Sequence, residues 1–214
     1  MPFDNIGFDP QRSTYLGDLR FRDVNGDNVI DGNDEVNIGD PIPDFNYSFN
    51  LKASYKNFDF SAFFTGVQGV DVLNFTALRS KSFVAVSSFS TDVLNRYTAT
   101  NTNTNIERYT ATDPNNNVGI SDKYIEDGSY LRFKNVTLGY SLNRGVLDNL
   151  FDGSINKLRV YVQGQNLYTF TKYTGVDPDV RPVYSNQGTI NGLGIDRGFS
   201  PAALTFITGL QIEF

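Results

Sequence analysis

The sequence predicts an all-β protein whose antiparallel strands belong to a transmembrane β-barrel. Apolar and polar side chains alternate over long runs, and long polar connections alternate with short ones. Aromatic residues make up 14% of the chain although only 39% of it is hydrophobic. Strands covered on both faces read as continuous apolar runs, whereas barrel strands are apolar on the lipid side only.

The clearest alternation covers residues 45–55, where a period of two places the apolar groups on one face of a strand. Lys56 and Asn57 follow as a short turn, and a second strand begins at Phe58, with Phe63 out of pattern. The pair predicts a hairpin. The apolar positions of the first strand are Phe45, Tyr47, Phe49, Leu51, Ala53 and Tyr55, and the polar positions are Asn46, Ser48, Asn50, Lys52 and Ser54.

Three further strands are expected at residues 130–142, 157–167 and 204–214. The apolar phase of the first shifts near Lys134 and Asn135, which predicts a β-bulge. Between the first two of these strands, residues 143–156 contain apolar residues that suggest a short helical turn.

The connections are unequal, since those at residues 69–129 and 169–202 are long and those at 56–57 and 143–156 are short. Outer-membrane barrels have long extracellular loops and short periplasmic turns. We therefore expect residues 1–44 to form an extracellular region and residues 45–214 to form the last five strands of a barrel. Five strands cannot close a barrel, so we expect the barrel to be incomplete in this chain. Met1–Asp4 has no signal-peptide character, and we expect an export signal elsewhere.

Composition excludes several functions. The chain has no Cys and no His, which excludes disulfides, thiolate metal sites and Ser-His-Asp catalysis. A net charge of -6 argues against nucleic-acid binding. Asp177 and Asp179 flank Pro178 and form either an acid–base pair or an ordinary turn. With no nucleophile beside a base, the sequence predicts a protein that is not an enzyme.

One segment carries the spacing of a calcium-binding loop. Oxygen donors stand at relative positions 1, 3, 5, 9 and 12, and a carbonyl is available at position 7. The alternative is an Asp/Asn-rich turn whose side chains accept backbone hydrogen bonds. The flanking residues look extended, so a helix-loop-helix is not expected. The candidate Ca²⁺ ligands are Asp23, Asn25, Asp27, Val29 through its carbonyl, Asp31 and Asp34.

Aromatic residues allow two interpretations. Phe45, Tyr47, Tyr55 and Phe58 suit the interfacial girdle of a barrel, or the core of a β-sandwich. Tyrosines in the long connections would contact sugars or a partner, or would serve as local packing anchors. These tyrosines are Tyr97, Tyr109, Tyr124, Tyr173 and Tyr184.

Several ordered motifs resemble SusC/RagA-type TonB-dependent outer-membrane transporters. The most specific is Tyr124–Tyr140, with sequence YIEDGSYLRFKNVTLGY, and Phe214 resembles the terminal residue that barrel-assembly machinery recognises. The other motifs are Gly17–Asp27, Ile38–Pro41 followed by Pro43–Phe45, Phe60–Gly69, Leu158–Val162 followed by Gly164–Leu167, and Tyr173–Pro178.

The resemblance implies the C-terminal strands of a large, 22-stranded barrel with a plugged lumen. It also implies import of oligosaccharides or peptides across the outer membrane of a Bacteroidota-like Gram-negative cell. The implied partners are membrane lipids, a SusD-like surface lipoprotein, and TonB acting through an N-terminal part that this chain lacks. The alternative is a secreted, Ca²⁺-stabilised β-sandwich for adhesion or glycan binding.

Overall fold

The computed structural model describes residues 15–81, 89–180, 183–184 and 190–214. The chain divides into two compact units. The first contains residues 1–40, 72–126 and 182–198, and the second contains residues 41–71, 127–181 and 199–214. The N-terminal region thus groups with parts of both long connections.

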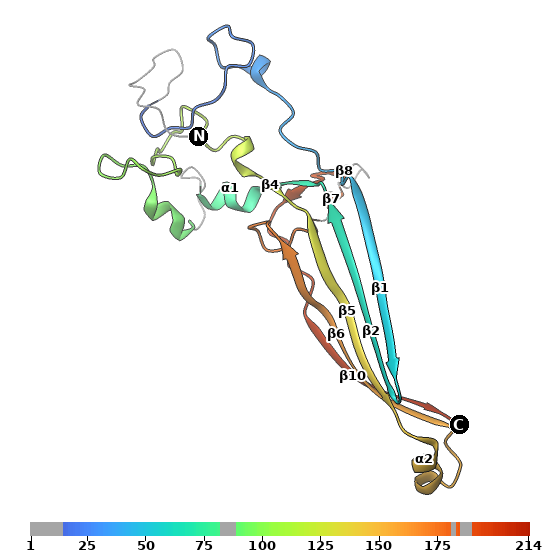
Figure 1. Cartoon of the computed structure of the whole chain (residues 1–214). Coiled ribbons are helices and arrows are strands. Elements are labelled where there is room, and N and C mark those ends of the chain that lie inside the picture. The colour runs from blue at the N-terminus through green and yellow to red at the C-terminus, as the bar shows by residue number, and fades with distance from the viewer. Residues whose placement is uncertain (1–14, 82–88, 181–182, 185–189) are drawn as a thin grey trace. The chain divides into compact units, whose positions relative to one another are not determined.

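The second unit is an antiparallel five-stranded sheet in the order β1-β2-β5-β6-β10 (Figure 1). Both outer strands are long and have no partner on their outer edge within the described residues, so the sheet is open. The strands are β1 (Phe45–Tyr55), β2 (Phe58–Gln68), β5 (Tyr130–Ser141), β6 (Lys157–Thr171) and β10 (Thr205–Glu213).

The short connections and the C-terminus gather at one end of this sheet (Figure 1). The β1–β2 turn is tight because Lys56 adopts a left-handed backbone conformation with φ 53°. Helix α2 (Arg144–Phe151) follows β5 and ends where Asp152 and Gly153 also adopt positive φ. The predicted strands and the short helical turn are confirmed, although β6 runs four residues beyond the predicted Leu167, to Thr171.

The predicted bulge is confirmed. The register between β2 and β5 places Phe64 opposite Phe133 and Phe63 opposite Asn135, so Lys134 has no opposite residue. The register between β5 and β6 also shifts at Lys134, where it passes from Phe133 opposite Tyr168 to Asn135 opposite Gln165. Because the extra residue restores the phase, Phe133 and Val136 share one face of the sheet.

The first unit contains the short elements that lie within the long connections. Strand β3 (Asp71–Asn74) lies between β4 (Ile125–Asp127) and β9 (Ile195–Asp196), and it pairs with β9 in parallel. A small core of Leu73, Leu78 and Tyr124 packs between β3, α1 (Phe75–Lys81) and η3 (Asp122–Tyr124). The remaining elements are η1 (Gly32–Asp34), η2 (Thr91–Asn95), β7 (Val183–Tyr184) and β8 (Ile190–Asn191).

Across the described ranges, no helix combines the length and apolarity needed to cross a membrane.

Candidate functional site

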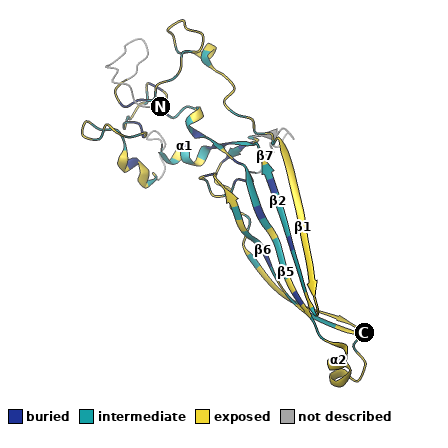
Figure 2. Ribbon diagram, in the orientation of Figure 1, coloured by how far each residue is buried: buried dark blue, intermediate teal, exposed yellow. Residues whose placement is uncertain are grey.

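One face of the five-stranded sheet is apolar from edge to edge. The register places Phe49 beside Phe64, Phe64 beside Phe133, and Phe133 beside Tyr168. Figure 2 shows β1 exposed along its length, and large apolar side chains of every strand are exposed. A β-sandwich would bury this face, so the sandwich interpretation does not fit. The exposed large residues of this face include Leu51, Leu138, Tyr140, Val160, Val162, Phe170, Phe206, Leu210 and Ile212.

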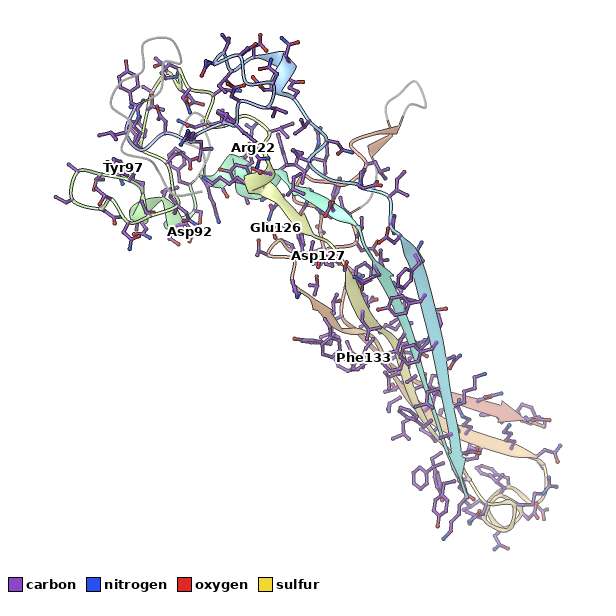
Figure 3. The ribbon with its side chains drawn as sticks, turned by 45° about the horizontal axis from the view of Figure 1, so that its top comes forward. Arg22, Asp92, Tyr97, Glu126, Asp127 and Phe133 are labelled. Carbon is purple, nitrogen blue, oxygen red and sulfur yellow. The ribbon has the colours of Figure 1, made fainter. Side chains whose placement is uncertain are left out.

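Aromatic rings form a band across the half of this face that leads to the long connections. Phe49 and Phe64 stack with ring centroids 4.3 Å apart, and Phe64 meets Phe133 edge-on at 4.6 Å. Phe133, labelled in Figure 3, contacts Phe170, which contacts Tyr168. The band therefore crosses β1, β2, β5 and β6 without a break.

A second group of rings lies at the opposite end of the face, beside the short connections. Phe58 and Tyr140 lie 4.8 Å apart, next to Tyr55 across the β1–β2 turn. From Phe45 to Tyr55 a strand covers about 33 Å, which at a tilt of about 40° spans roughly 25 Å of membrane normal. That height matches the apolar band of an outer-membrane barrel.

The other face of the sheet is polar and carries an ion pair. Arg159 of β6 reaches across β5 to Asp59 of β2, with Nε–Oδ1 and Nη2–Oδ2 distances of 2.8 and 2.5 Å. Gly139 lies beneath this pair, and a Cβ atom there would collide with both side chains. The bidentate geometry joins three strands on one face.

A second polar contact fixes the connection after β6. Arg132 of β5, with a side chain 3% exposed, donates to Asp177 and, through Nε, to Thr169 Oγ1 at 2.9 Å. Asp177 also accepts the backbone N–H groups of Asp179, at 2.9 Å, and Ala202, at 3.2 Å. Asp177 therefore ties β5 to the turn after β6 and to the approach to β10. Asp179 Oδ2 lies 3.6 Å from Arg132 Nη1. Asp177 and Asp179 therefore belong to a turn whose carboxylates are both paired with Arg132.

Opposing effects act on Asp177. Burial raises the pKa of its carboxyl, but the hydrogen bonds from Asp179, Arg132 and Ala202 outweigh burial and lower the pKa below its usual 3.8. The carboxylate is thus held ionised, as an acceptor from Arg132. Such a charge is unsuited to the role of a general acid near neutral pH.

The calcium-loop residues form a compact, hydrogen-bonded loop. Both oxygens of Asp23 accept backbone N–H groups, from Gly26 at 2.6 Å and Asn28 at 2.8 Å. Asp34 accepts from Val24 and Asp31 at 2.7 and 3.0 Å, and it completes a capping box with Asp31 around η1. The other contacts run from Asp27 N to Asn25, from Val29 N to Asp27, and from Asn33 N to Asp31.

These contacts are those expected of a self-capped turn. In the part of the chain that the structure describes, no group of three or more His, Cys, Asp or Glu residues is placed to hold a metal ion. The candidate donor positions are nevertheless all on one short loop, and Ca²⁺ binding stays a prediction.

The first unit contains buried charges that the sequence does not reveal. Asp18, whose side chain is fully buried, accepts from Arg108 at 2.7 and 3.1 Å and from Asn117 at 3.0 Å. Asn117 in turn accepts the N–H of Leu19 at 2.8 Å. Because a buried carboxylate needs partners, this network fixes the segment around Asp18 against residues 108–117.

A second buried carboxylate, Glu107, pairs with Lys123 and accepts from the Tyr124 hydroxyl at 3.4 Å. Burial and the charge of Glu107 raise the pKa of Tyr124. Tyr124 and Tyr173 are buried, and Tyr97 packs over Gly17, so these three are packing anchors. Tyr109 is exposed, and the side chain of Tyr184 lies outside the described residues.

Known proteins resemble this chain in sequence and in structure. No protein-family profile matches the chain. TonB-dependent receptor P3 of Formosa agariphila is 38% identical over 195 residues, which are 91% of this chain and 19% of that receptor. TonB-dependent receptor SusC of Bacteroides thetaiotaomicron is 31% identical over 194 residues, covering 91% of the chain and 17% of SusC. The chain is homologous to a segment of SusC-type TonB-dependent receptors.

This SusC-type segment spans about a fifth of the length of the curated relatives it matches. A structure of the RagAB peptide transporter superposes with TM-score 0.63 and 25% identity, over 78% of this chain and 17% of that chain. The RagAB peptide importer in its closed-closed state gives TM-score 0.66 at 24% identity, over 81% and 18% of the two chains, and supports the fold alone. The sheet is therefore part of a large transmembrane β-barrel that is incomplete in this chain, and the predicted family is confirmed.

The two faces predict opposite responses to charge. In the outer-membrane protein that carries this segment, Leu51→Arg places a cation on the apolar face and should cost about 2–4 kcal/mol of unfolding free energy. Asn50→Arg, the next residue on the polar face, should cost about 0–0.5 kcal/mol. Urea unfolding in lipid vesicles measures both. Equal losses would show that the faces are wrongly assigned.

The Asp177 contacts predict an acid-sensitive connection. Because its folded pKa is depressed, Asp177 contributes stability that is complete above its usual pKa of 3.8 and is lost as pH falls below that value. Asp177→Asn should remove about 2 kcal/mol at neutral pH and flatten this dependence. Hydrogen exchange of the backbone after β6 measures the loss. Asp179→Asn is the control, since Asp179 is half exposed and should matter little.

If the loop from Asp23 to Asp34 binds Ca²⁺, isothermal titration calorimetry of the intact membrane protein should show heat of Ca²⁺ binding. The Asp27→Ala substitution should abolish that heat. Absence of heat with the unchanged protein would leave the self-capped turn as the whole explanation. Asp44→Ala, outside the loop, serves as the control.

Proposed function

We propose that this chain forms part of the wall of a TonB-dependent importer in the outer membrane of a Bacteroidota-like Gram-negative bacterium. The observation that carries the proposal is the exposed apolar face bounded by aromatic rings at both ends, with polar side chains behind it. In lipid, every backbone group of a strand needs a neighbouring strand, so the open edges of the sheet call for further strands.

The polar face would then line the lumen. Its ion pair from Arg159 to Asp59 lies near the short connections, and Arg132 lies near the long ones. A charged lumen is favourable where water or a plug domain contacts the wall, and unfavourable against lipid.

The end of the sheet with short connections would face the periplasm, and the end with long connections would face outward. We assign the loop from Asp23 to Asp34 to the extracellular side on the same reasoning. If it binds Ca²⁺, the ion would be structural and would brace the mouth of the barrel.

The proposed cargo is an oligosaccharide or a peptide. The structural neighbour RagAB is described as a peptide transporter, and the relative from B. thetaiotaomicron is named SusC. By the family resemblance, a SusD-like surface lipoprotein would cover the mouth. TonB would supply energy through a part of the receptor outside this sequence.

Membrane extraction tests the proposal. The protein should remain with outer membranes through high salt and alkaline carbonate, and should enter solution only with detergent. Folded barrel should migrate differently from the heat-denatured chain in gel electrophoresis. Co-purification with a surface lipoprotein, detected after mild detergent extraction, would support the partner.

A soluble, monomeric chain with a sharp thermal transition in buffer would overturn the proposal. That result would return the secreted β-sandwich to consideration, and Ca²⁺ dependence of the transition would then support it.

A further inference from the structure

Helix α2 has an apolar stripe wider than its packing requires. At 100° per residue, Val146, Leu147, Leu150 and Phe151 cover an arc of about 140°. Leu147 is 1% exposed, so it is the residue that packs inward. Val146 and Leu150, one turn apart on the same stripe, are 45% and 64% exposed, and Phe151 is also exposed. Two adjacent apolar side chains therefore face away from the protein.

The helix is fixed at the end of the sheet. Asn57 in the β1–β2 turn donates to Ser141 O at 2.9 Å and also to Asn143, which immediately precedes α2. On the other side of the helix, Arg144 donates to Asn156 Oδ1 at 2.8 Å, and Asn156 N donates to Glu213 O at 2.7 Å. These contacts hold α2 against the short-connection end instead of leaving it as a free loop.

The exposed stripe lies close to the apolar face of the sheet. The chain from Tyr140, in the aromatic group at this end, to the start of α2 is four residues, at most about 14 Å. The interfacial layer of a bilayer begins where the aromatic rings of a barrel lie. Phe214, at the same end, is 83% exposed and continues the apolar positions of β10. Exposed apolar side chains of the strands and of the helix are thus gathered at the same end of the sheet.

Charge on α2 is compatible with a lipid surface. Arg144 and Asp148 form an ion pair of 3.1 Å, one turn apart, so the first turns carry no net charge. Asp148 lies about 160° around the helix from both Val146 and Leu150, which leaves the side opposite the exposed stripe polar and suited to water and headgroups.

We propose that α2 is a membrane-surface helix whose Val146 and Leu150 side chains insert into the phospholipid leaflet next to the short-connection end of the barrel. The proposal rests on the proposed function, because it needs the sheet to stand in a membrane. The helix would set the depth of the barrel at this leaflet, independently of the aromatic rings on the strands.

Depth-dependent fluorescence quenching tests the proposal. The chain has no cysteine, so Leu150→Cys introduces one site in it for an environment-sensitive dye, with any cysteine elsewhere in the protein replaced by serine. The labelled protein is reconstituted in phosphatidylethanolamine–phosphatidylglycerol vesicles containing brominated lipid. The Leu150 label should be quenched roughly twofold or more over a label at Asp148→Cys, on the opposite side of the helix, and more by bromines near the headgroup than by deep ones.

A label at Leu138→Cys, on the lipid face of β5, is the reference. If it is not quenched, the proposed membrane function fails. If it is quenched while the Leu150 and Asp148 labels behave alike, the barrel stands and only the membrane-surface role of α2 is overturned. Should Leu150→Cys fail to fold, Val146→Cys provides the second position and is expected to give the same pattern.

Discussion

Pairing between neighbouring strands is the constraint on which the rest of this structure depends. A strand that faces lipid has no water for its N–H and C=O groups, so each must be satisfied by the next strand. Backbone hydrogen bonds between neighbouring strands, in the order β1-β2-β5-β6-β10, satisfy these groups inside the sheet. Because side chains alternate along every strand, the same ladders align most of the apolar groups on one face and most of the polar groups on the other, and Phe63, opposite Asn50, is an exception.

The polar face shows how such a sheet accommodates charge. Arg159 is able to reach Asp59 across an intervening strand because that strand has glycine at position 139. Glycine costs strand stability through its conformational freedom, and here the cost is offset by room for a bidentate ion pair. At the other end of the sheet, Arg132 is nearly buried and is neutralised by Asp177 from the following connection. Both arginines of this face thus have a carboxylate partner from a different segment.

In the first unit, the long connections have defined secondary structure and a core of their own. Long loops in compact proteins are uncommon unless they carry function, and these contain short strands, a helix and a small core. The buried carboxylates of Asp18 and Glu107 pair with cations 90 and 16 positions further along the chain. A unit fixed by such networks has a defined surface.

The sequence by itself determined the strands, their faces and the bulge at Lys134, because a period of two is a local property that every residue of a strand repeats. It also determined the family, through motifs that relatives share. Only the tertiary structure decided that Asp177 binds Arg132, that Asp59 meets Arg159, and that Asp18 is buried beside Arg108. These pairs join residues separated by 45, 100 and 90 positions. No periodicity in the sequence links such partners. They come together because of the strand register and the paths of the long connections, which are not local properties of the sequence.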